Sequence, residues 1–586
     1  MCNDGLHHVT GQALQDVKEE ISTLIAQIIA SEPENESHKP SKNVTIYKGT
    51  ILTMANGQYT PQEAMAIHND TILAVGTFSD VTHAVSLTDL PSATHDLGTK
   101  CIVPGFVEPH IHLLLTALFT NLASTPILDM TFPTIRTLPS AIDLLASSIP
   151  HDPKTWIIAF GYDPSLVTDH LEPTLSLLDS VATTNPIFII NQSGHLAYCN
   201  TAAFHAAGFP TQKGQPHFPE SDDYEKDENG NLSGVVKEDA VTTMAGYLPK
   251  SLFAHMIANV RPTLRKWASR GCTTVFDCGV GMFAGLFDVD IIAGLISVRT
   301  FPRFRGVLAA KVVEQMGVQK FLEKHGRPPW DVGRVSVQGV KIWLDGSTQG
   351  LTAAVKEEYL HPPRENPRGK LNYEVEDLEE LVKPLAEKGW QVVMHANGGR
   401  AVEQGLDVLE KVGRGTYMHR LEHVTADVNK ELIERAKELN VGVSHLVAHV
   451  RKWGKTFEEW VLGEERAKRI DPFRDDVKTG AVYSFHSDSP VSEVDPLRYV
   501  DTAVTRKTEN GSVLGEDQTI EVEDAFRGIT YNPAKQLGAL GEIGTLEKGK
   551  KADFVILSVD PRLVPKGELD GGCEVVETWV GGVQIK

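Results

Sequence analysis

The stretch FVEPHIH (106–112) has the composition of a short buried strand that ends in two histidines, two positions apart. Alternate side chains of a strand share a face, so His110 and His112 would point to the same side. Seven further apolar runs follow along the chain, each typical of a buried parallel strand. They are TTVFDCG (273–279), RFRGVLAA (303–310), VQGVKIWLDG (337–346), QVVMHANGG (391–399), HRLEHV (419–424), GVSHLVA (442–448) and AVYSFHSDSP (481–490).

Segments with helical periodicity lie between these runs. EVEDLEELVKPLAEKG (374–389) repeats leucine and valine at helical spacing, and TADVNKELIERAKELN (425–440) does the same, with Thr425 or Asp427 as the expected N-cap. Eight strand-helix units predict an α/β fold, a (β/α)8 TIM barrel over residues 105–535. The long excursion at 113–265 is expected to form an insertion, or lid, over the barrel mouth.

The two chain ends have a different pattern. Residues 43–104 and 536–586 contain short runs rich in β-branched residues, separated by glycine turns. We expect both parts to form one small β-sandwich domain. Residues 1–42 are predicted to be an appended helix (13–30) followed by a polar linker.

Composition narrows the class of protein. The 586 residues carry 56 Lys plus Arg and 77 Asp plus Glu, a net charge of −21, which disfavours nucleic acid or an anionic membrane as partner. No apolar run reaches the roughly 18 to 20 residues of a spanning helix, and the start does not resemble a secretory signal. Six cysteines without a CxxC pair indicate a reducing compartment. We therefore expect a cytoplasmic protein with a small-molecule substrate, and a homodimer is the candidate assembly.

Single polar residues interrupt several of the predicted strands near their carboxyl ends. These are Lys341, His395, His423 and Asp488. Burying such groups is costly unless they bind something, although each alone could equally be a satisfied core residue. Together with the His110 and His112 pair, they form the imidazole and carboxylate set that zinc or a similar divalent ion prefers.

Lys341 fits such a site only in a neutral or modified form, because an ammonium repels a cation. A buried lysine favours its neutral amine, which can capture carbon dioxide and become an anionic carbamate. The alternative is an ion pair with Asp345 or another acid, and the residues alone leave both open.

An ordered series of motifs resembles the amidohydrolase superfamily, and within it the family 3 branch that includes N-substituted formamide deformylases. The resemblance runs from about residue 44 to the end of the chain. Its motifs include PGFVEPHIH (104–112), SGHLAYCN (193–200), DENGNLSGVVKEDA (227–240), GCTTVFDCG (271–279), VKIWLDGST (340–348), VVMHANGGRAV (392–402), HRLEHV (419–424) and SDSPVSEVDP (487–496).

The resemblance implies a metal-dependent hydrolase that cleaves a non-peptide C–N bond, in an amide or N-acyl compound, by a metal-activated hydroxide. It implies a metal centre of one or two Zn2+ per chain, binuclear when both ions are bound, with Asp488 at the first metal and acting as general base. By motif, the first metal binds His110 and His112, the second binds His395 and His423, and an N6-carboxylated Lys341 bridges them.

Departures from the family pattern leave the substrate open. Glu108-Pro109 precedes the histidine pair, Gly399 replaces an acid, and His445 and His449 occupy the predicted seventh strand. Gly399 and the pair of His445 and His449 motivate an alternative in which the same metal site performs decarboxylation, C–C cleavage or cyclisation. A non-catalytic scaffold is a further alternative.

Four residues are candidate substrate contacts. They are His195, Tyr162, Trp343 and Arg420. A structural hydrogen bond is the alternative for His195, and core packing or a structural ion pair is the alternative for the other three. His486 is expected to lie behind the ligands.

Overall fold

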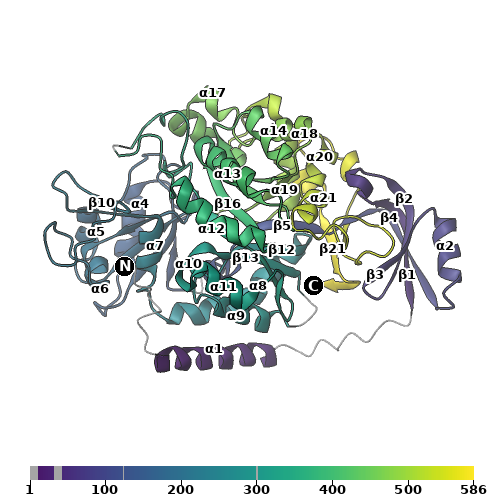
Figure 1. The fold of residues 1–586 in the computed structure, drawn as a ribbon, viewed down its shortest axis with the longest axis horizontal. Coiled ribbons are helices and arrows are strands. Elements are labelled where there is room, and N and C mark those ends of the chain that lie inside the picture. The colour runs from purple at the N-terminus through teal and green to yellow at the C-terminus, as the bar shows by residue number, and fades with distance from the viewer. Residues whose placement is uncertain (1–10, 32–42, 123–124, 298–300, 364, 586) are drawn as a thin grey trace. The chain divides into compact units, whose positions relative to one another are not determined.

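The computed structural model describes residues 11–31, 43–122, 125–297, 301–363 and 365–585. Eight parallel strands form a barrel, which confirms the predicted fold class (Figure 1). In chain order they are β5 (Phe106–Ile111), β12 (Cys272–Val280), β13 (Arg303–Ala309), β15 (Val335–Trp343), β16 (Gln391–Gly398), β17 (Arg420–Ala426), β18 (Gly442–Leu446) and β19 (Tyr483–His486). A parallel bridge between Ile111 and Ser489 brings the first and last strands together.

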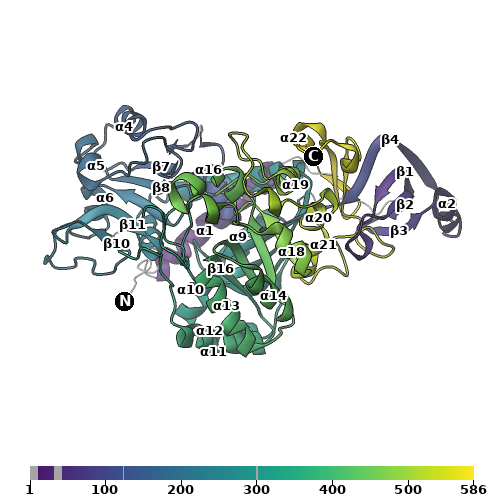
Figure 2. The ribbon, with the colours of Figure 1, turned by 90° about the horizontal axis from the view of Figure 1, so that it is seen from above.

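The barrel strands are buried on both faces, which explains their continuous apolar sequence. Every residue of β12, β16 and β17 is buried, as expected where helices cover a parallel sheet. The covering helices include α12 (Val375–Glu387) and α13 (Gly399–Val412), which pack against β16, and α14 (Lys430–Glu438), which packs against β18 (Figure 2). In α12, Leu378, Leu381, Val382 and Leu385 are buried, as their spacing predicted.

Two local predictions were wrong. Helix α14 is capped by Asn429, whose side chain accepts a hydrogen bond from the Leu432 N–H at 3.1 Å, and neither Thr425 nor Asp427 has this role. Strand β18 ends at Leu446, so His449 lies in the short helix α15 (Ala448–Arg451) and not in the strand.

Strands from the two chain ends pair in one seven-stranded sheet, where the purple and yellow segments meet in Figure 1. Its order is β22-β21-β20-β4-β1-β2-β3. The N-terminal members are β1 (Val44–Leu52), β2 (Pro61–His68), β3 (Thr71–Gly76) and β4 (Ser92–Pro104); the C-terminal ones are β20 (Phe554–Leu557), β21 (Val575–Val580) and β22 (Val583–Ile585). Strands β4 and β20 pair antiparallel and join the two ends.

The chain divides into two compact units. The insert unit contains 114–259, 346–352 and the N-terminal helix up to Ala26, and the barrel unit contains the rest of the described chain. The insert unit has its own six-stranded sheet, in the order β10-β11-β9-β8-β7-β6, and its own apolar core. These strands are β6 (Ile127–Asp129), β7 (Ile157–Tyr162), β8 (Ile187–Asn191), β9 (Leu196–Cys199), β10 (Tyr224–Lys226) and β11 (Leu232–Lys237). The placement of this insertion over the barrel mouth stays a prediction.

The appended segment contains a helix where one was expected, α1 (Gly11–Ser31), while the predicted linker lies outside the described residues. The five described cysteines are all free and buried, and Cys2 lies outside the described part. Within that part, no helix is both long enough and apolar enough to cross a bilayer.

Candidate metal centre

The histidine pair of β5 meets Asp488 where the barrel closes. The Nε2 atoms of His110 and His112 each lie 3.2 Å from Asp488 Oδ1. The Asp488 N–H donates to the His110 carbonyl at 3.1 Å, and Asp488 has a left-handed backbone with φ 53°. Burial alone would raise the pKa of Asp488, but the two histidines outweigh it and hold the pKa well below its usual range. An ionised carboxylate thus faces two imidazoles.

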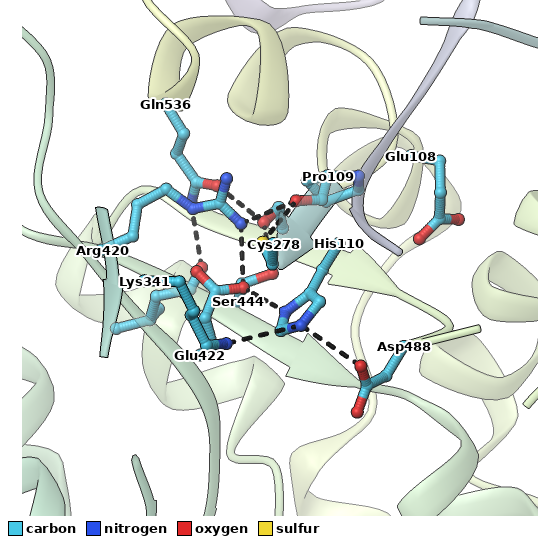
Figure 3. A network of polar contacts seen from close by, with 12 residues as sticks. Glu108, Pro109, His110, Cys278, Lys341, Arg420, Glu422, Ser444, Asp488 and Gln536 are labelled. Atoms are coloured by element: carbon cyan, nitrogen blue, oxygen red, sulfur yellow. Dashed lines mark hydrogen bonds and ion pairs between the residues drawn. The ribbon is translucent and has the colours of Figure 1, made fainter. Parts of the chain in front are cut away.

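An ion pair on β17 fixes the orientation of the His110 ring. The His110 Nδ1–H donates to Glu422 Oε2 at 2.6 Å, and the same oxygen accepts from Arg420 Nη2 at 2.9 Å. Figure 3 shows Glu422 between His110 and Arg420, with Asp488 on the opposite side of the ring. Burial would raise the pKa of Glu422, yet Arg420 and His110 hold it well below its usual range. With the proton on Nδ1, the lone pair of His110 Nε2 is available to a cation.

The backbone of β17 departs from extended geometry at His423 and Val424, and this brings His423 to the same site. Strand alternation would place Glu422 and His423 on opposite faces. However, His423 and Val424 have left-handed backbones, with φ 75° and 50°, and the pleat is interrupted. The His423 ring centroid lies 5.1 Å from that of His110 and 4.4 Å from that of His395 on β16.

Lys341 comes from β15 and is fully buried. Its Nζ lies 3.5 Å from His110 Nε2 and 5.5 Å from the ring centroid of Trp343. Among the described residues, no carboxylate lies within ion-pair distance of the Lys341 Nζ. Asp345 instead accepts from the backbone N–H groups of Ala354, Asn397 and Gly398 at 2.8 to 2.9 Å. The ion pair with Asp345 considered above is therefore not formed.

The residues present fit a divalent cation. His423 is buried, and neither of its ring nitrogens has a hydrogen-bond partner among the described residues. Burial and the neighbouring His395 hold the pKa of His423 well below its usual range, so the ring is neutral, the form that ligates metals. The ligand atoms of His110, His112 and Asp488 lie within 4.8 Å of one another.

A second group with metal-ligand spacing joins His110, Glu422 and His486. The Arg420 guanidinium already donates to Glu422 at 2.9 Å, and its positive charge would repel a metal ion bound at Glu422. His486 stacks on His110 with ring centroids 4.5 Å apart. These contacts favour packing behind the ligands, as expected for His486.

The candidate substrate residues are held by different contacts. Arg420 is fully buried and donates to Glu422 and to the Pro109 carbonyl, which favours the structural ion pair. In the insert unit, the Tyr162 hydroxyl donates to the Leu171 carbonyl at 2.8 Å, and His195 Nδ1 lies 2.8 Å from Glu238 Oε2. Trp343 is partly buried beneath the Lys341 amine. Substrate contact by His195, Tyr162, Trp343 and Arg420 stays a prediction.

Two of the sequence departures have a structural explanation. Glu108 accepts from the Ser487 N–H at 3.0 Å and from the Tyr499 hydroxyl at 3.0 Å, and burial raises its pKa to about 8. It thereby connects β5 to the loop that carries Asp488. A Cβ atom at Gly399 would lie 2.4 Å from the Asp427 carbonyl oxygen, so the Asp427 backbone occupies the position that a side chain at 399 would need.

Residues 93–585 match the amidohydrolase family. The chain belongs to the amidohydrolase family. It is accordingly an enzyme, a hydrolase for carbon–nitrogen bonds, in a family that uses a divalent metal, and the resemblance drawn from its motifs is confirmed.

Known proteins similar to this amidohydrolase span nearly its whole length. It is 25% identical over 535 residues to N-substituted formamide deformylase of Arthrobacter pascens, covering 89% of this chain and 94% of the relative. It is 26% identical over 569 residues to the protein LONG AFTER FAR-RED 3 of Arabidopsis thaliana, covering 93% and 91%. An uncharacterized metal-dependent hydrolase from Pyrococcus horikoshii OT3 has a similar structure, with a TM-score of 0.67, 25% identity, and coverage of 89% and 99%.

Glu422 and Asn397, which support the predicted ligands, were not predicted from the sequence, and Arg420 was expected only as a substrate contact, with core packing or a structural ion pair as the alternative. Arg420 and Glu422 are two positions apart on β17, a spacing that places both on one face, and this signal could have indicated a buried pair. Asp345 and Asn397 follow Lys341 and His395 within a few residues, but their backbone and side-chain contacts depend on the fold.

Proposed function

We propose that this amidohydrolase cleaves a non-peptide C–N bond, in an amide or N-acyl small molecule, at a zinc centre bound by His110, His112, His395, His423 and Asp488. The observation that carries the proposal is His423, a buried neutral imidazole with two unpartnered nitrogens among the described residues. Imidazole with carboxylate is the donor set that zinc prefers. The similarity to a formamide deformylase supports an amide-type substrate.

Lys341 is proposed to be N6-carboxylated. Its amine is fully buried, with His110 Nε2 at 3.5 Å and no described carboxylate in ion-pair range, and a buried unpaired ammonium is costly. Reaction of the neutral amine with carbon dioxide forms an N–C bond and releases one proton. The product is an anion that supplies two oxygen ligands between the histidine pairs.

Asp488 is proposed to move the proton. A divalent ion bound at this centre supplies Lewis acidity and lowers the pKa of water to about 7. The Asp488 carboxylate is ionised and is held at equal distance from His110 and His112. It accepts a proton from the attacking water and then delivers it to the leaving nitrogen as the C–N bond breaks.

The proposal is tested with a panel of N-formyl and N-acetyl amines in oxygen-18 water. We expect release of the amine, with one labelled oxygen in the carboxylic acid. Asp488→Asn should lower kcat at least about a hundredfold, while Asp553→Asn, which alters a buried aspartate paired with Arg303, should retain activity. Turnover without label would instead favour the non-hydrolytic alternative, and an active Asp488→Asn enzyme would contradict the assigned proton transfer.

A further inference from the structure

Strand β5 and the residue that follows it hold the loop that carries Asp488. We call residues 487–489 the Asp488 loop. Three hydrogen bonds connect it to the strand: the Ser487 N–H donates to Glu108 Oε1 at 3.0 Å, the Asp488 N–H to the His110 carbonyl at 3.1 Å, and the His112 N–H to the Ser489 carbonyl at 3.0 Å. Two of these three bonds join backbone to backbone. Only the bond to Glu108 depends on the identity of a side chain.

The loop needs this attachment because Asp488 has an unfavourable backbone. Its φ of 53° is left-handed, a conformation that a residue with a side chain keeps only where its surroundings impose it. The Asp488 carbonyl accepts from the Val491 N–H at 2.8 Å, which fixes the turn after Asp488. Before Asp488, the bond from Ser487 to Glu108 fixes it. The direction of the Asp488 carboxylate therefore depends on Glu108.

Glu108 also reaches helix α19 (Pro496–Thr505), beyond the Asp488 loop. Its Oε2 accepts from the Tyr499 hydroxyl at 3.0 Å, and the Tyr499 oxygen accepts from the Asp495 N–H at 3.0 Å. Asp495 is the N-cap of α19. One carboxylate thus joins the start of the Asp488 loop to the start of this helix. Glu108 is only 1% exposed, so bulk water does not compensate for the loss of either contact.

We propose that Glu108 is a positioning residue for Asp488 and that the length of its side chain is the property the site requires. The inference rests on the proposed function, in which Asp488 binds the metal and moves the proton. A side chain one methylene shorter withdraws its carboxylate by up to about 1.5 Å, the length of one C–C bond. A 3.0 Å contact stretched this far is no longer a hydrogen bond, so the shorter side chain cannot keep both Ser487 and Tyr499.

Two substitutions separate the length of the side chain from its charge. Glu108→Asp keeps the acid and shortens the side chain. Glu108→Gln keeps the length, because its Oε1 accepts from the Ser487 N–H and its Nε2 donates to the Tyr499 oxygen. The Tyr499 hydroxyl then donates to the Glu493 carbonyl, which lies at 3.3 Å.

Zinc affinity of the full chain is the readout, measured by competition with a chelator, so the result does not depend on turnover. We expect Glu108→Asp to weaken zinc affinity at least about tenfold, the effect of losing an outer partner of a ligand. Glu108→Gln should stay near the wild-type value. A role that depended on the charge of Glu108 would reverse this order.

The same comparison in an Asp488→Ala background tests whether Glu108 acts through Asp488. Once the Asp488 carboxylate is absent, Glu108→Asp should cause no further loss of zinc affinity, so the two losses should not multiply. An effect transmitted through His110, which lies on the same strand, would persist in the double variant.

Gln338→Asn is the matched control for shortening a buried side chain by one methylene. Gln338 is fully buried on β15, and its Nε2 donates to Gln391 Oε1 at 2.9 Å and to the Leu537 carbonyl at 3.1 Å. The control should lower the melting temperature as Glu108→Asp does, while zinc affinity stays at the wild-type value. If Glu108→Asp does not fold, Tyr499→Phe replaces it, since it removes one of the two contacts and leaves β5 unchanged.

Three results would each overturn the positioning role alone. They are a Glu108→Asp variant that binds zinc like the Gln338→Asn control, a Glu108→Gln variant that loses as much affinity as Glu108→Asp, and a loss that persists in the Asp488→Ala background. A wild-type chain that binds no zinc, or Asp488→Ala with unchanged affinity, would overturn the proposed function and this inference with it.

Discussion

The two sides of the candidate metal centre orient their histidines in different ways. On one side, His110 donates directly to Glu422, and Arg420 neutralises that carboxylate within 2.9 Å. On the other side, His395 Nε2 contacts the neutral Asn397 at 3.0 Å and lies 3.6 Å from the Asp345 carboxylate, which accepts from three backbone N–H groups. The first side uses a carboxylate paired with an arginine, and the second uses a neutral amide beside a carboxylate that backbone N–H groups hold.

This difference predicts which substitutions near the metal centre lower stability and which lower metal affinity. A buried ion pair loses several kcal/mol when one partner is removed, because the other charge stays unpaired. A neutral hydrogen bond contributes about 1 kcal/mol. Breaking the Arg420–Glu422 pair should therefore act mainly on the fold, and losing the Asn397 contact should act mainly on metal affinity.

Glu422→Gln should have the largest effect. It keeps the shape of the side chain but leaves the buried Arg420 cation without its partner, so the free energy of unfolding should fall by about 3 to 5 kcal/mol. Urea denaturation of wild type and variant measures this loss. A variant as stable as wild type would show that the Arg420–Glu422 pair does not support the His110 side.

His445 should make stability depend on pH in the alkaline range. Burial would lower its pKa, but Asp476 and Asp471 outweigh burial and raise it to about 9. Since the unfolded value is near 6.5, the stabilisation is about 3 kcal/mol, fully present below pH 6.5 and lost as the pH rises through about 9. Urea midpoints between pH 6 and 10 measure it. In His445→Gln this dependence should disappear; an unchanged profile would assign the transition to another group.

Tyr499→Phe should have the smallest effect of the three. It removes the hydroxyl that donates to Glu108 Oε2 at 3.0 Å, and a loss of about 1 kcal/mol is expected. Tyr483→Phe is the matched control, because its buried hydroxyl donates to the Asp524 carbonyl at 2.8 Å. We expect both variants to lose similar stability, with weaker zinc binding only for Tyr499→Phe. Equal zinc affinity would show that Glu108 has no influence on the Asp488 loop.

The barrel could be predicted because its strands are buried on both faces and therefore appear as continuous apolar runs. The N-cap of α14 could not be predicted from the sequence. The Thr425 hydroxyl forms hydrogen bonds with Asn397 and His449. Asp427 accepts from the Lys356 N–H and pairs with Arg466. Both side chains are engaged in contacts distant in sequence, so Asn429 is left to cap the helix.

The candidate site was predictable to the level of its donor residues. Strand spacing places His110 and His112 on one face, and the motifs indicate Lys341, His395, His423 and Asp488. The residues that orient these donors were not predictable in this way. Glu422 lies 312 residues from His110 along the chain. The left-handed backbone at His423 breaks the alternation that a strand predicts. Backbone geometry and distant pairing, which single-sequence patterns do not encode, decide these contacts.

Metal content per chain is the most direct test that this amidohydrolase depends on a metal. Mass spectrometry of the purified protein, beside Lys341→Ala, should find about two equivalents of zinc in wild type and fewer in the variant. One equivalent unaffected by the substitution would make Lys341 a structural residue at a mononuclear site. No metal in either protein would contradict the account.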